Sequence, residues 1–85
     1  MTKPEKTLPI AIKISVRKSE PVKDRLSRVS AKLDEIQKGE YAEIISDDEK
    51  MLKLAPRMTQ SIGKAKFIKS WVGDDNYFHT LVEKK

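Results

Sequence analysis

The chain of 85 residues carries 18 Lys and Arg against 13 Asp and Glu, has a formal net charge of +5, and contains no cysteine. This length fits one domain, and the basic balance is compatible with a polyanionic partner. The lack of cysteine excludes disulfides, thiolate chemistry and cysteine-ligated metals. There is no run of about 18 apolar residues and no apolar signal-peptide core, so we expect no membrane span and, by default, a cytoplasmic location.

The N-terminal part predicts a tail followed by a strand. Residues 1–7 are polar and show no periodicity, so we expect a flexible tail, with residues 8–85 forming the single domain. From Leu8 to Val16 an apolar side chain occupies every second position, and most are β-branched. A period of two with such residues predicts a strand with one buried face.

A short basic turn, residues 17–21, then leads into a predicted helix from Pro21 to Lys38. Proline suits the first helical position. Apolar residues recur along one face at spacings of four, three, four and three, namely Val22, Leu26, Val29, Leu33 and Ile36. Gly39 fits the position just after a helix.

The middle of the chain predicts a second strand and a second helix. Tyr41 to Ser46 alternates as a short strand, and residues 46–49 (Ser-Asp-Asp-Glu) fit a capping box. Met51, Ala55, Met58 and Ile62 share one helical face. Pro56 interrupts this pattern, so we expect either a short piece followed by a main helix near Pro56 or one kinked helix. Gly63 should end it.

Two further strands are predicted, Ala65 to Val72 and Tyr77 to Val82, joined by a turn at residues 73–76. Either face of the last strand is a candidate for burial. The order is β-α-β-α-β-β, and right-handed crossovers place both helices on one side. We therefore expect an α/β (α+β) two-layer sandwich with a mixed four-stranded sheet and two helices on one face.

Four pieces of the sequence share their order and spacing with a known family. They are Glu20-Pro21-Val22 at the helix start, residues 39–48 with their acidic end Asp47-Asp48, Pro56, and Gly63 with the aromatic closing strand ending at Lys84. Together they make residues 8–84 resemble the TusA/SirA-like sulfur-carrier family. The resemblance implies the fold given above and a partner in sulfur or redox metabolism.

The motif that carries the family's activity is altered. The family's sulfur-accepting cysteine falls at Lys18, the first proline of its Cys-Pro-x-Pro motif falls at Ser19, and the first helix is about one turn longer here. Persulfide transfer needs a thiolate nucleophile, which Lys18 cannot supply. We therefore expect the fold without the sulfur transfer.

Basic residues gather at the turn and along one flank of the first helix. Arg25, Arg28 and Lys32 lie in a narrow arc beside the apolar stripe, and a helix N-terminus favours anions. This surface is a candidate for phosphate contacts without sequence specificity. The competing interpretation is a solvated flank partly neutralised by Asp24 and Glu35. The candidate binding residues are Arg17, Lys18, Ser19, Glu20, Arg25, Arg28 and Lys32.

A second basic group surrounds Trp71 and consists of Lys64, Lys66 and Lys69. A sheet with aromatic side chains among lysines can stack bases. On a regular strand Lys66 and Lys69 have opposite parity, so they cannot both share a face with Trp71, and the competing interpretation puts Trp71 and Phe67 in the core. His79 is expected to be a structural or surface residue, and the acidic groups are expected to form caps and turns. No metal or cofactor is expected.

The leading hypothesis is a non-catalytic TusA-like binding or adaptor domain that engages a protein partner in sulfur or redox metabolism. It predicts an exposed apolar patch near the turn at residues 17–21. The alternative is a small basic RNA- or DNA-binding module that uses the basic face of the first helix. Neither hypothesis involves an enzyme, and the unpaired sheet edges can support a dimer.

Overall fold

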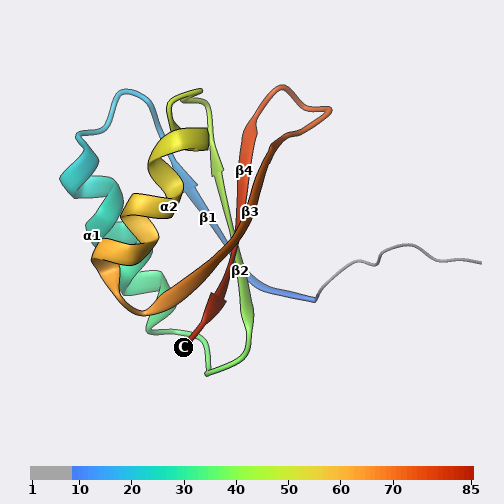
Figure 1. Cartoon of the computed structure of the whole chain (residues 1–85). Coiled ribbons are helices and arrows are strands. Elements are labelled where there is room, and N and C mark those ends of the chain that lie inside the picture. Colours follow the sequence, from blue (N-terminus) through green and yellow to red (C-terminus); the bar gives the residue numbers. More distant parts are fainter. Residues whose placement is uncertain (1–8) are drawn as a thin grey trace, which may run out of the picture.

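The computed structural model in Figure 1 describes residues 9–85, so the expected tail at residues 1–7 and the first residue of the expected strand lie outside the described part. The elements follow the expected β-α-β-α-β-β order. They are β1 (Ile10–Val16), α1 (Val22–Leu33), β2 (Tyr41–Ser46), α2 (Met51–Ile62), β3 (Ala65–Val72) and β4 (Phe78–Lys84).

The strands form one four-stranded sheet in the order β1-β2-β4-β3. β1 and β2 are parallel, and β4 runs antiparallel to both β2 and β3. Both helices cover the same face of this sheet (Figure 1). The expected two-layer sandwich with a mixed sheet is therefore confirmed. Within residues 9–85, no helix is long and apolar enough to cross a membrane.

The core lies between the sheet and the helices. Apolar residues at every second strand position point inward and meet the apolar faces of both helices. Burying one such side chain completely contributes about 1.5–3 kcal/mol. In β4 the inward positions include Thr80 and Val82, which pair with Ile44 and Ala42 of β2. This pairing settles which face of the last strand meets the helices.

The first helix is shorter than the apolar spacing suggested: α1 ends at Leu33 and not at Lys38. Beyond it the N–H groups of Glu35 and Ile36 bond three residues back, which tightens the chain into a narrower turn. The Lys84 ammonium donates to the carbonyl oxygens of Leu33 and Ile36 at 2.5 and 3.1 Å. A cation at this position offsets the negative end of the helix dipole and satisfies free carbonyls.

The second helix runs from Met51 to Ile62 with Pro56 inside it, so of the two expected alternatives the single helix is found and the separation into two pieces is wrong. The capping box at residues 46–49 is also wrong, since the N-cap is Lys50, which makes no side-chain cap. Ser46 and Asp48 instead accept hydrogen bonds from backbone N–H groups two residues ahead. Gly63 ends the helix in a left-handed conformation, as expected.

Candidate binding site at the loop end

Three connections meet at one end of the molecule. The sheet pairings make β1, β2 and β3 run in one direction, so their carboxyl ends lie together with the amino ends of both helices (Figure 1). We call this the loop end and define it as residues 17–21, 47–50 and 73–77. The turn that carries most of the candidate residues is part of it.

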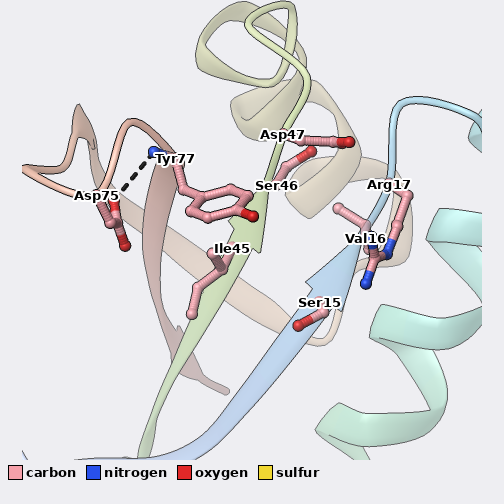
Figure 2. A pocket seen from close by; sticks show the side chains of 8 residues that line it. All are labelled: Ser15, Val16, Arg17, Ile45, Ser46, Asp47, Asp75 and Tyr77. Carbon is pink, nitrogen blue, oxygen red and sulfur yellow. Dashed lines mark hydrogen bonds between the residues drawn. The ribbon is translucent and has the colours of Figure 1, made fainter.

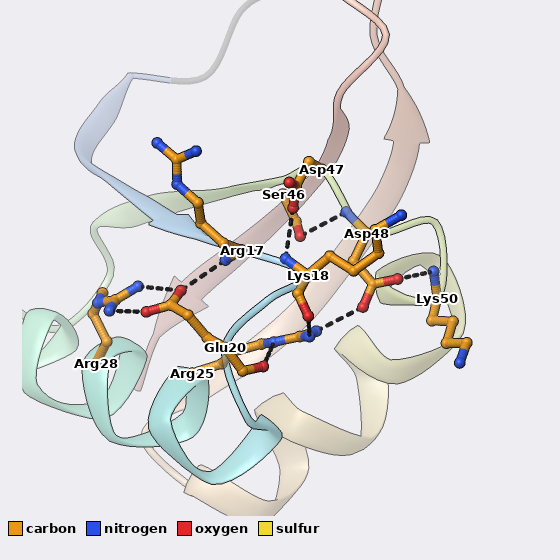
Figure 3. A network of polar contacts seen from close by, with 9 residues as sticks. All are labelled: Arg17, Lys18, Glu20, Arg25, Arg28, Ser46, Asp47, Asp48 and Lys50. Atoms are coloured by element: carbon orange, nitrogen blue, oxygen red, sulfur yellow. Dashed lines mark hydrogen bonds and ion pairs between the residues drawn. The ribbon is translucent and has the colours of Figure 1, made fainter.

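Arg25, in the first turn of α1, holds the loop end together (Figure 3). The residue is only 4% exposed. Its Nη1 donates to Asp48 Oδ2 at 2.9 Å, and its Nε and Nη2 donate to the carbonyl oxygens of Glu20 and Lys18, both at 3.0 Å. A buried guanidinium requires such partners because an unpaired buried charge is costly. Arg25 thus ties the β1–α1 loop to the β2–α2 loop.

The two loops are also joined directly. The Lys18 N–H donates to Asp47 Oδ1 at 2.6 Å, and Asp48 Oδ1 accepts from the Lys50 N–H at 3.0 Å. Burial raises the pKa of Asp48, but the Lys50 N–H and the guanidinium bound to the same carboxylate outweigh it, so the net shift is downward. The carboxylate therefore stays ionised at neutral pH and keeps the connection.

A second ion pair occupies the outer side of the turn (Figure 3). Arg28 donates to both carboxylate oxygens of Glu20 and, at 2.9 Å, to the carbonyl oxygen of Ser15. The Arg17 N–H also donates to Glu20 Oε1 at 2.7 Å. The hydrogen bond from Arg28, followed by that from Arg17, lowers the pKa of Glu20 to about 2. The turn is therefore fixed by its own side chains.

The structure does not gather the expected cations into one free basic surface. Arg25 is buried and paired, Arg28 is paired with Glu20, and Lys32 lies 3.8 Å from Glu35. The other positions of the turn, residues 17–19, are exposed. The first helix thus presents a basic flank whose charges are largely compensated.

A shallow pocket opens where β1 and β2 end (Figure 2). Its volume is about 260 Å³, and it is lined by Ser15, Val16, Arg17, Ile45, Ser46, Asp47, Asp75 and Tyr77. In Figure 2 the Tyr77 ring extends over the β2 residue Ile45 towards β1. The pocket combines an apolar wall with charged groups of both signs, which suits a side chain or a short peptide segment.

Exposed apolar side chains also occur at this end. Four large apolar residues among those described are exposed, and Val22, Val72 and Tyr77 lie in or directly beside the loop end, with exposures of 43, 56 and 45%. The remaining one, Ile68, is in the middle of β3. The sequence drew attention to the turn but gave no sign that Val72 and Tyr77 would join Val22 there.

The hairpin side of the pocket is anchored by His79. Its Nδ1 lies 2.6 Å from Glu43 Oε2, and its Nε2 lies 3.1 Å from Asp75 Oδ1. Burial lowers the pKa of His79, but its hydrogen bonds to Asp75 and Glu43 outweigh burial and raise it. When protonated, the imidazolium donates to both carboxylates and fixes the turn against the sheet. His79 is therefore structural in its contacts.

Within residues 9–85, no group of three or more His, Asp or Glu side chains is arranged to hold a metal ion. No family model matches this chain. No curated protein matches it either. The resemblance to the TusA/SirA-like family consequently rests on the sequence pattern, and the fold described here is of the kind that this resemblance implies.

Proposed function

We propose that this protein is a non-catalytic TusA-like binding domain that engages a protein partner, in sulfur or redox metabolism, through its loop end. The observation that carries the proposal is the pocket at this end, which is lined in part by the exposed Tyr77, together with the exposed Val22 and Val72 beside the neighbouring loops. Exposed aromatic and apolar side chains near a pocket with polar lining are typical of protein-interaction surfaces.

The fixed geometry of the turn supports this proposal. Arg25 and Asp47 hold the turn to the next loop, and Glu20 pairs with Arg28 across its outer side. A surface that is already ordered loses less conformational freedom when a partner binds. Cysteine-dependent sulfur transfer needs a cysteine, which this chain lacks.

Nucleic-acid binding by the first helix is the weaker candidate. Arg25 would have to leave its buried ion pair with Asp48 to reach a phosphate, and Arg28 would have to leave Glu20. Both losses count against the affinity that phosphate contacts supply.

Site-specific photo-crosslinking in cells tests the proposal. A photoreactive amino acid is placed at Val22 or Tyr77, and a matched control is placed at Lys38, which is exposed at the opposite end. We expect the same discrete protein to be crosslinked from both loop-end positions and not from Lys38. Equal products from the two ends, or loop-end products that disappear after nuclease treatment, would contradict the proposal.

A further inference from the structure

In the described part of the chain no helix covers the sheet face opposite α1 and α2, although Leu81 and His79 on this face are buried by their neighbours. The register of β2 with β4 places Tyr41, Glu43 and Ile45 opposite Glu83, Leu81 and His79, all on this face. β1 adds Lys13 at one edge, since Ile12 and Ile14 on either side of it point towards the helices. The two central strands thus present apolar and aromatic residues together with the carboxylates Glu43 and Glu83, and the edge strand β1 presents a lysine.

A bulge in β3 brings three further residues onto this face. The register shifts between Phe67 and Lys69, so Lys66, Lys69 and Trp71 pair with Glu83, Leu81 and His79 in turn. Strict alternation would have put Lys66 and Lys69 on opposite faces of the sheet. That expectation is wrong because the extra residue in the bulge, Ile68, returns Lys69 to the same face as Lys66. Phe67 packs against the core as one interpretation had it, whereas Trp71 does not.

Trp71 is held in a defined orientation on this face. Its ring stacks on His79 with centroids 5.3 Å apart and planes 11° apart. The Lys69 ammonium lies 5.2 Å from the centre of the indole. His79 is in turn fixed by Glu43 and Asp75. The indole is only partly buried, so part of the ring is accessible from solution.

Two cations at the edges of this face are free to contact an anion. Glu43 and Asp75 are engaged by His79, and Glu83 lies 4.0 Å from Lys66. Within residues 9–85, Lys13 and Lys69 form no ion pair, and they lie on the two outer strands of the sheet. The register places Glu43 and Leu81 between these two lysines, so a ligand that crosses the sheet would meet a cation at each edge. Trp71 lies next to Lys69 along the edge strand β3.

We propose that the open sheet face binds single-stranded nucleic acid. Bases stack on Trp71 and Tyr41, and phosphates are contacted by Lys13 and Lys69. Each base has a π-face, so such stacking tolerates any sequence, and lysines beside the rings neutralise the backbone. Bases inside a duplex are already stacked on each other and cannot reach an indole on a sheet. This surface adjoins the loop end proposed for the protein partner, because Ile45 belongs to this face and also lines the loop-end pocket.

The test uses the full chain and a labelled thymidine oligonucleotide of about ten nucleotides, followed by fluorescence anisotropy. We expect micromolar binding at about 50 mM salt that weakens about tenfold by about 200 mM. Lys13→Glu/Lys69→Glu should weaken binding at least about tenfold and reduce the salt slope by about 1.4. The matched control Lys23→Glu/Lys53→Glu makes the same charge change on exposed helix positions and should have an effect below about threefold.

A second pair of variants separates stacking from charge. Trp71→Leu should weaken binding about tenfold, while Trp71→Phe, which keeps a ring, should retain most of it. Thermal unfolding of each variant checks the fold. The proposal would be overturned if the sheet-face and the helix double charge reversals weakened binding equally. It would also be overturned by equal affinity for a duplex or for heparin, or by no binding at low salt. A dimer in sedimentation that buries Trp71 would overturn it as well.

Discussion

Replacing Arg25 with methionine should destabilise the domain strongly. The sequence pattern placed this side chain on a basic flank of the first helix, but in the structure it is buried. Methionine keeps much of the apolar length but removes the donors to the Asp48 carboxylate and to two backbone carbonyl oxygens. Removing one partner of a buried ion pair costs about 3–5 kcal/mol, and we take about 3 kcal/mol because the site is near the surface. For a domain of this size that lowers the Tm by about 12–24 °C.

Urea and thermal denaturation measure this loss, with Arg28→Met as the matched control. Arg28 makes a more exposed ion pair, with 39% of its side chain exposed, so its removal should cost less. Arg25→Met/Asp48→Asn should recover part of the loss, because asparagine keeps an acceptor for the Lys50 N–H without an unpaired charge. If Arg25→Met and Arg28→Met unfold alike, Arg25 is not the central connection of the loop end.

The pH dependence of the same variants gives an independent check. The folded pKa of Asp48 lies below its ordinary value of 3.8, so this group stabilises the fold above that pH and the contribution is lost as pH falls through the folded pKa. In Arg25→Met the burial of Asp48 is no longer opposed by the guanidinium, and its pKa should rise. The stability difference from wild type should then shrink in acid.

Three other predictions concern the hairpin and the helix end. His79 has a folded pKa above 6.5, so the stabilisation that its protonated form provides should be complete below that pH. It should be lost as the pH rises through the folded pKa, and urea denaturation across this range measures the loss. The fluorescence of Trp71, the single tryptophan, should change in the same range because its ring stacks on His79. Gly73→Ala should also destabilise the fold by about 1–3 kcal/mol, because a Cβ there would lie 2.5 Å from His79 Nε2 and 2.6 Å from Asp75 Oδ1. Thermal unfolding measures this loss, and an unchanged Tm would contradict the packing described. Lys84→Met should cost about 1 kcal/mol and speed amide exchange in the last turn of α1, and unaltered exchange would count against its capping role.

The periodic parts of the sequence specified the fold well. Alternation in the strands and the apolar stripe in the helices each depend on one dominant force, the burial of an apolar face. The end of α1 was misjudged because Ile36 remains in the core even though the chain has already left the helix. The Lys84 ammonium, which bonds the carbonyl oxygens at this end, is distant in sequence and cannot be recognised from a local pattern.

The candidate site was harder to predict because it depends on contacts between separate segments. One signal was available: Arg25 falls between Val22 and Val29 along the apolar stripe, and a buried arginine needs a carboxylate. The acidic pair Asp47-Asp48 follows the neighbouring strand and could have supplied it. The bulge at Ile68 had no such signal, because nothing in the strand sequence marks where the extra residue falls.

The most direct test of the central claim is to measure, by calorimetry, the affinity between this protein and the partner protein that is crosslinked at the loop end. The measurement compares wild type with Val22→Asp/Tyr77→Asp and with the matched far-end variant Gln37→Asp/Lys38→Asp, all checked for folding. We predict that the loop-end variant loses at least about tenfold in affinity while the far-end variant stays within about threefold of wild type. Equal affinities for all three proteins would contradict the assignment of the loop end as the binding surface.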